Sequence, residues 1–222
     1  ALASAQAALS DRHCLITDRS CAPHTESSLS PQKIWRDIKA RFKPSLTLQQ
    51  NASGLRADDI YRFGRAHFRH HGVLLNLKPP YEGGIVHWTH PLPLHIEGWI
   101  NVYTIHDVIP LTHPDLTPMD SVRHTQLLKA IIETADHIVT ISKHARDAIL
   151  RNTTCRPYQI TDCSIAVSSP NPNRHELLGQ FSRGGYYIYM GSGEPRKNLQ
   201  RLVEAYNASK STRPLLLVGD HA

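Results

Sequence analysis

The stretch "YYIYMGSGEPRKNL", residues 186–199, contains the residue types needed to bind a phosphate group. An apolar run ends in a Gly-Ser-Gly turn at 191–193, and the cations Arg196 and Lys197 follow shortly before a predicted helix. Glycines let backbone amides approach a ligand closely, and a helix N-terminus attracts anions. A solvated basic helix start fits the same residues, so the residues alone leave both interpretations open.

The stretch "YTIHDVIPL" places His106 and Asp107 directly after a predicted strand at 100–105. Ligands bind at the carboxyl ends of strands in open α/β sheets, so His106 is a candidate for orienting a reacting hydroxyl. The alternative is a structural histidine with Asp107 capping the next segment. Without further context the residues favour that alternative.

A metal site is a hypothesis for "HFRHHG", since His67, His70 and His71 share one helix face. No carboxylate or cysteine stands at ligand spacing beside them, and two arginines occupy the same helix. We therefore expect a surface or interdomain face there, and no metal.

Alternating strands and helices must position these residues. Strands separated by helices of this length indicate βαβ units and a mainly parallel, doubly wound sheet. The expected elements of the first part are a helix at 58–70, strands at 73–77, 85–88 and 100–105, a helix around 118–135, a strand at 137–142 and a helix at 143–151.

The alternation of strands and helices stops at 168–185, where prolines, glycines and small polar residues indicate a linker. We therefore predict a domain at 1–167 and the start of a second at 186–222, with a strand, a helix over 198–209 and a strand at 214–219. One βαβ unit cannot cover a parallel sheet on both faces, so we expect this second domain to be incomplete.

Bulk composition limits the classes of partner. The chain has 222 residues, 40% of them hydrophobic, and a formal charge of +6, which suggests an anionic partner. The charge is spread along the chain without an aromatic–basic stacking motif, so nucleic acid is the weaker choice. No apolar run is long enough to span a bilayer, and the sparse cysteines favour a reducing, cytoplasmic location.

Residues 30–44, "SPQKIWRDIKARFKP", predict a basic amphipathic helix with Ile34, Ile38 and Phe42 on one face. Such a helix can lie on an anionic membrane surface, which would make the protein peripheral on the inner membrane. A domain helix with a solvated charged face is the alternative, and the residues favour it somewhat.

Three segments together resemble family 4 glycosyltransferases of bacterial cell-surface polysaccharide synthesis. "GSGEPRKNLQRLVEAY" is similar to the start of their second domain, "YTIHDVIPL" to their H-D-x-x-P element, and "ETADHIVTISKHARDAI" to their A-D-x-I-x-x-x-S segment. The resemblance covers residues 85–219 well and the first fifty poorly. It implies a GT-B fold, with a Rossmann-like N-terminal domain and the first βαβ of a second one.

The resemblance also implies a function: retaining transfer of a sugar such as mannose from a nucleotide-diphosphate sugar to a lipid-linked or saccharide acceptor. His106 would lie near the transferred sugar. Asp107 and Glu194 would be supporting residues. The donor diphosphate would be bound by Gly191, Ser192, Gly193, Arg196 and Lys197. No cofactor is implied, and the absence of any D-x-D sequence argues against the metal-dependent class of glycosyltransferase.

The sequence departs from the family pattern in ways that leave an alternative open. Gly193 replaces a bulkier residue, and no E-x7-E segment follows the second predicted domain start. The alternative is a non-catalytic GT-B remnant that serves as a binding or scaffolding module.

Overall fold

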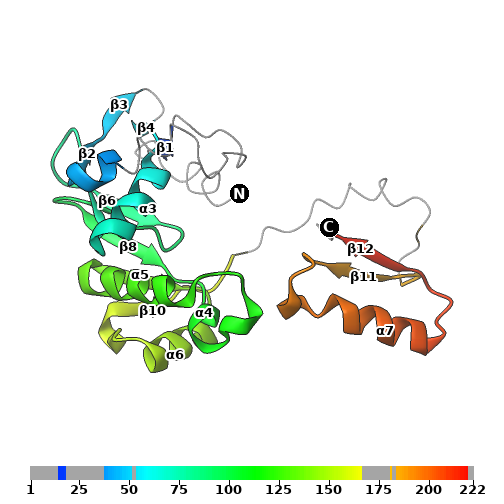
Figure 1. Cartoon of the computed structure of the whole chain (residues 1–222). Helices are drawn as coiled ribbons and strands as arrows, with labels where there is room; N and C mark the ends of the chain where they lie inside the picture. Colours follow the sequence, from blue (N-terminus) through cyan, green and yellow to red (C-terminus); the bar gives the residue numbers. More distant parts are fainter. Residues whose placement is uncertain (1–14, 19–37, 52–53, 167–180, 182–183, 220–222) are drawn as a thin grey trace. The chain divides into compact units, whose positions relative to one another are not determined.

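The structure is a computed structural model that describes residues 15–18, 38–51, 54–166, 181 and 184–219 (Figure 1). The chain divides into two compact units. Unit 1 comprises Ala1–Val108 and Val122–Ser164, and unit 2 comprises Ile109–Ser121 and Ile165–Ala222. The predicted linker at 168–185 lies almost wholly outside the described residues, and the boundaries at 167 and 186 stay predictions.

Unit 1 alternates strands and helices. Its elements are β1 (Leu15–Asp18), β2 (Ser45–Thr47), β3 (Gln49–Asn51), β4 (Gly54–Ala57), α3 (Ile60–His71), β5 (Leu75–Lys78), β6 (Ile85–Trp88), β7 (Leu94–Ile96), β8 (Ile100–Thr104), α5 (Ser121–Thr134), β9 (His137–Thr140), α6 (Lys143–Asn152), η2 (Pro157–Gln159) and β10 (Ile160–Asp162). A further helical segment covers 38–42. Because strands recur after helices, neighbouring strands pair mostly in parallel.

The described strands of unit 1 form three hydrogen-bonded sheets, in the orders β10-β9-β8-β6, β2-β5-β7 and β1-β4-β3. All pairs are parallel except β3 with β4, which is antiparallel. Strand β8 lies between β6 and β9, with Val102 opposite both His87 and His137. The fold is therefore α/β and compatible with a Rossmann-like arrangement.

One apolar core joins these sheets. Leu55 of β4, Ile60 of α3, Leu77 of β5, Ile96 of β7 and Tyr103 of β8 are all fully buried in it. Helix α3 packs on β5, and α6 packs on β9 and β10. Burial of this kind stabilises by about 1.5–3 kcal/mol for each large side chain, so the carboxyl ends of these strands are rigid supports.

Unit 2 contains α4 (Ile109–Thr112), η1 (Pro114–Leu116), β11 (Tyr187–Met190), η4 (Pro195–Lys197), α7 (Leu199–Ser209) and β12 (Leu215–Val218). Strands β11 and β12 pair in parallel, with Tyr187 opposite Leu215. Because a helix of eleven residues connects two parallel strands, this is the βαβ unit that the sequence predicts.

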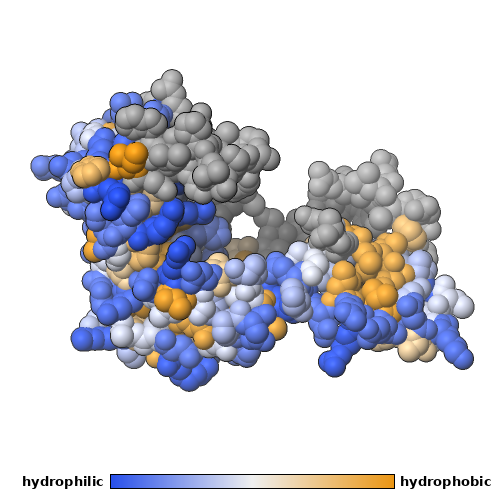
Figure 2. Space-filling view, in the orientation of Figure 1, coloured by the Kyte–Doolittle hydropathy of each residue, from blue (hydrophilic) through white to orange (hydrophobic). Residues whose placement is uncertain are grey.

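The sheet of unit 2 exposes much of its apolar surface. No residue from 184 to 219 is buried. Exposure reaches 56% for Ile188, 75% for Met190 and 45% for Val218. Figure 2 shows hydrophobic residues gathered over this sheet. Parallel sheets are ordinarily covered on both faces, so these side chains form a surface on which further elements can pack.

Most expected elements are confirmed within two or three residues. Of the basic helix predicted within residues 30–44, the part at 30–37 lies outside the described residues, and a helical segment covers 38–42. Its buried residue is Ala40, whereas Ile38 is 45% and Phe42 82% exposed. Both interpretations of the whole helix, on a membrane surface or in a domain with a solvated charged face, stay predictions.

Candidate functional site

His106 lies just beyond the carboxyl end of β8, which side-chain bonds hold on both sides. The Thr140 hydroxyl donates to the Ile105 carbonyl at 2.7 Å, and the Tyr103 hydroxyl donates to the Leu94 carbonyl at 2.5 Å. Burial raises the pKa of Tyr103, so its hydroxyl stays a donor at any physiological pH. The backbone that presents His106 is thus fixed by a sheet and by buried hydrogen bonds.

The amino end of β8 is held just as firmly by Asn101, which is fully buried. Its side-chain amide donates to the carbonyls of Ile96 at 2.9 Å and Trp99 at 2.8 Å. Its oxygen accepts from the indole of Trp88 at 3.1 Å and the amide of Ile96 at 2.9 Å. Every hydrogen-bonding position of the amide is used, so the residue fixes β7 against β8 without a burial penalty.

The hydrogen bond of His106 determines its tautomer. Its Nε2 lies 2.9 Å from the Thr89 carbonyl oxygen, and because a carbonyl can only accept, Nε2 carries the hydrogen. The neutral ring then has an accepting lone pair at Nδ1. The ring of His90 lies 5.1 Å from that of His106, centroid to centroid. His106 can therefore accept a hydrogen bond from a hydroxyl group, as the predicted role requires.

Asp107 is exposed, and its carboxylate acts on a histidine of the next helix in unit 1. The pKa of His124 in α5 is lowered by burial, and Asp107 opposes that shift. Sequence reasoning did not single out His124, because no local pattern links a position in α5 to the end of β8.

The Gly191–Lys197 turn follows β11 in unit 2. The Gly191 amide donates to the Val218 carbonyl at 3.0 Å, and the Tyr189 hydroxyl donates to the Ser192 carbonyl at 3.1 Å. Neither Gly191 nor Gly193 belongs to the described residues with positive φ. The glycines therefore provide room for close approach rather than an unusual backbone conformation.

Glu194 organises the polar side chains of the turn. Its carboxylate accepts from the Arg196 Nε at 2.7 Å and from the Ser192 hydroxyl at 2.9 Å. These bonds, the one from Arg196 foremost, lower the pKa of Glu194. Arg196 is thus anchored through Nε, and the structure records no protein partner for its two terminal nitrogens within the described residues. This pairing makes Glu194 a positioning group, a role that the sequence indicated only as support.

Lys197 ends the short helix η4, and only Asn198 separates it from the start of α7. Its ammonium group makes no ion pair with any carboxylate in the part of the chain that the structure describes. Asn198 bridges η4 and α7 in a left-handed conformation, φ 52°, and its side chain does not cap α7. The cation and the uncapped helix start together attract a negative charge.

Gly219 was not identified from the sequence, yet it contacts the turn directly. It follows β12 with φ +136°, and a β-carbon there would collide with the carbonyl oxygen of Gly191. The carboxyl ends of β11 and β12 therefore meet through two glycines. A sequence reading could have found this only by pairing β12 with β11, which brings the two strand ends together.

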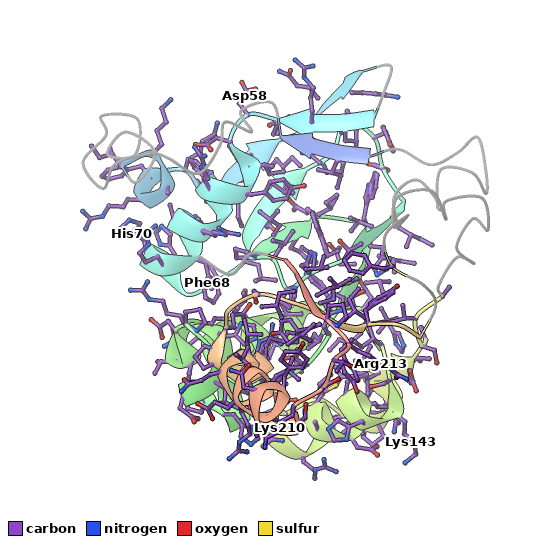
Figure 3. All side chains as sticks on the ribbon, turned by 90° about the vertical axis from the view of Figure 1, so that its right-hand side faces the viewer. Asp58, Phe68, His70, Lys143, Lys210 and Arg213 are labelled. Carbon is purple, nitrogen blue, oxygen red and sulfur yellow. The ribbon has the colours of Figure 1, made fainter. Side chains whose placement is uncertain are left out.

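The histidines of α3 hold the helical segment 38–42. His67 Nδ1 lies 3.3 Å and His71 Nε2 3.1 Å from the Ala40 carbonyl oxygen. His67 is buried, which corrects the expectation of a surface face for that residue, while His70 and His71 are exposed. His70 is labelled on α3 in Figure 3. Burial lowers the pKa of His67, so its ring is neutral near pH 7.

Neither a metal-binding cluster nor a membrane-spanning helix occurs among the described residues. No three His, Cys, Asp or Glu side chains among them cluster in a way that could hold a metal ion. No helix among them is long and apolar enough to cross a bilayer.

The structure places His106 and Asp107 in unit 1 and residues 191–197 in unit 2. Within each unit the predicted residues do come together: His106 with Asp107 at the end of β8, and the glycines, Glu194, Arg196 and Lys197 in one turn.

Comparison with known proteins gives one informative similarity. The chain is 31% identical over 134 residues to the O-antigen chain mannosyltransferase B of Escherichia coli, which covers 53% of this chain and 34% of that protein. The chain thus matches about a third of the length of this curated relative. No protein-family profile matches the chain, and no solved structure matches it.

Proposed function

We propose that the chain is part of a retaining glycosyltransferase with a GT-B fold, related to family 4. It would transfer a hexose from a nucleotide-diphosphate sugar to a lipid-linked or saccharide acceptor in polysaccharide assembly. Support comes from the partial similarity to a protein named as an O-antigen mannosyltransferase and from the turn after β11. A peripheral position on an anionic membrane belongs to the same proposal.

The observation that carries the proposal is Lys197, which forms no ion pair within the described residues, beside the start of α7, which no side chain caps. When the bond between the sugar and the diphosphate breaks, negative charge develops on the departing oxygen. A fixed cation stabilises that charge more in the transition state than in the ground state, so it acts mainly on turnover. The anchored Arg196 would bind the diphosphate through its terminal nitrogens, and Gly191, Ser192 and Gly193 would allow its approach.

The test is turnover with a nucleoside-diphosphate mannose in the full-length protein. Loss of one such contact costs on the order of 3 kcal/mol, so Lys197→Ala should lower kcat about a hundredfold. Lys197→Arg should restore part of it, since a fork does not reproduce a point charge. Lys210→Ala serves as the matched control, because Lys210 is an exposed lysine at the other end of α7. Equal kcat for wild type and Lys197→Ala would mean that the turn is only a solvated helix start.

A second candidate function is a non-catalytic binding or scaffolding module. The exposed apolar residues of β11 and β12, including Ile188 and Met190, favour it because they offer a surface for a protein partner. One measurement distinguishes the two functions. A full-length protein that binds the nucleotide sugar but neither transfers nor hydrolyses it would support the module.

A further inference from the structure

A cavity of about 580 Å³ lies in unit 1, away from His106 in the sequence and formed by other elements. The segment 38–43, strands β2, β3 and β4, and the start of α3 line it. Neither the sequence analysis nor the proposed sugar transfer assigns it a role. Its lining holds three cationic side chains, from Lys39, Lys43 and Arg56.

The three cations are brought together by backbone geometry. The Lys43 amide donates to the Lys39 carbonyl at 2.9 Å, so the two lysines lie one helical turn apart on the same side. Arg56 follows the fully buried Leu55 along β4, and alternation along the strand turns it away from the core. Two elements distant in sequence thus bring three positive charges to one hollow.

None of the three cations has a counter-charge within the described residues: no carboxylate oxygen there lies within 4.0 Å of their nitrogens. Other cations of the molecule are paired, such as Lys143 with Asp147 at 3.1 Å and Arg196 with Glu194 at 2.7 Å. Three positive charges that line one cavity without an ion pair among the described residues attract an anion.

Two carboxylates also line the cavity, so its cations outnumber its carboxylates by three to two. Asp59 forms an ion pair with Arg62 at 3.9 Å, which lies outside the lining. Asp58 is exposed and is labelled in Figure 3. The hydroxyl of Thr47 and the side-chain amide of Gln49 add neutral donors to the lining.

We propose that this cavity binds a diphosphate-bearing ligand. Arg56 would bind two phosphate oxygens with its planar fork, and Lys39 and Lys43 would act as point charges on the others. A volume of about 580 Å³ exceeds that of a diphosphate, so the ligand carries a further group. The diphosphate belongs either to a soluble molecule or to a lipid headgroup. The proposal does not depend on sugar transfer.

Calorimetric titration with inorganic pyrophosphate tests the site. All proteins carry Arg196→Ala and Lys197→Ala, which together remove both cations of the turn in unit 2 and so weaken binding there. Arg56→Gln, and the double change Lys39→Gln with Lys43→Gln, should each weaken binding by about tenfold, whereas Lys129→Gln on α5 should not. Circular dichroism and the thermal midpoint confirm that each variant folds. An unchanged Kd in the folded Arg56→Gln protein, or no pyrophosphate binding by the parent, would overturn the proposal.

A second arm distinguishes the source of the diphosphate. Phosphatidylcholine vesicles carrying a polyprenyl diphosphate should compete with pyrophosphate and sediment the protein if the ligand is a lipid. The exposed Phe42, next to Lys43, would then contact the apolar part. A soluble ligand predicts no competition by these vesicles and competition by a free nucleoside diphosphate. Because the site lies in unit 1, its failure would leave the Lys197 test unaffected, and the reverse also holds.

Discussion

At the scale of single residues, the surroundings of His106 limit its chemistry to one ring nitrogen. Its Nε2 hydrogen is used by the Thr89 carbonyl at 2.9 Å, and only Nδ1 is left to accept from a substrate hydroxyl. The chemistry proposed for this histidine therefore depends on one ring atom, and substitutions that keep one nitrogen position while removing the other can separate the two roles.

Glutamine and asparagine make that separation at position 106. His106→Gln retains a donor toward Thr89 but loses the acceptor at the Nδ1 position, so kcat should fall about tenfold, equivalent to one lost hydrogen bond. His106→Asn keeps a polar atom near Nδ1 and should be less impaired in kcat but lower in thermal midpoint. Steady-state kinetics and thermal melts measure both quantities.

The control for position 106 is His137→Gln, since His137 is bonded to the exposed Thr161 hydroxyl at 2.9 Å. This change should leave kcat unaltered. If both glutamine variants had wild-type kcat, His106 would be a structural residue, as the residues alone favour.

At the scale of elements, the contact between α3 and the helical segment 38–42 contains a buried histidine, His67. The pKa of His67 is lowered first by burial and further by His71 and His70, while its bond to the Ala40 carbonyl opposes the shift. Between the lowered pKa and the ordinary value of 6.5, the unfolded chain binds more protons than the folded one. Stability must therefore rise with pH through that interval and fall as the pH drops below 6.5.

The expected outcome is a lower thermal midpoint of unit 1 at pH 5 than at pH 7.5. The pKa values of His95 and His124 are also lowered by burial and add to the trend. His67→Asn should reduce the dependence, because asparagine keeps a donor near the Nδ1 position that can bond the Ala40 carbonyl without titrating. Scanning calorimetry across this range measures it, and a midpoint that rises on acidification would contradict the sign.

Long, strongly patterned elements could be predicted from the sequence, and short polar ones could not. Strand β8 and the β11–α7–β12 unit have apolar runs, turn residues and helices of ordinary length. Strands β2 and β3, "SLT" and "QQN", have three residues each and no alternating pattern, so only tertiary pairing makes them strands. Strand β7 was not predicted either, because it is equally short and its Leu94 and Ile96 are recognisable only through their burial.

In the candidate site, too, features that are local in sequence could be predicted and features that depend on tertiary structure could not. The order of strand, glycines and cations predicted the turn, because those features are local in sequence. The pairing of Arg196 with Glu194 and the contact of Gly219 with Gly191 could not be predicted, since side-chain direction and strand register decide them. The contact of segment 38–42 with α3 could not be predicted either, because it depends on the approach of His67 and His71 to the Ala40 carbonyl.

For the whole molecule, we propose that protein cations, and not a metal ion, supply the positive charge opposite the leaving diphosphate. Sugar transfer by the full-length protein should therefore survive excess EDTA, because Lys197, Arg196 and the start of α7 would neutralise the leaving diphosphate. Initial rates with and without the chelator, after removal of bound metals, measure this. Loss of the rate in EDTA and its return with manganese would assign the protein to another class of glycosyltransferase.

The two glycines at the ends of β11 and β12 limit what positions 191 and 219 can tolerate, each for a different reason. A β-carbon at Gly219 would collide with the backbone carbonyl oxygen of residue 191, which every amino acid there carries, so position 219 should remain glycine whatever stands at 191. A β-carbon at Gly191 would come within 3.0 Å of the Tyr189 hydroxyl oxygen, the far end of a side chain that can move. In a library randomised at both positions, 191 should therefore accept more residues than 219, and attempts to engineer a new phosphate-binding turn after β11 should vary 191 and keep 219.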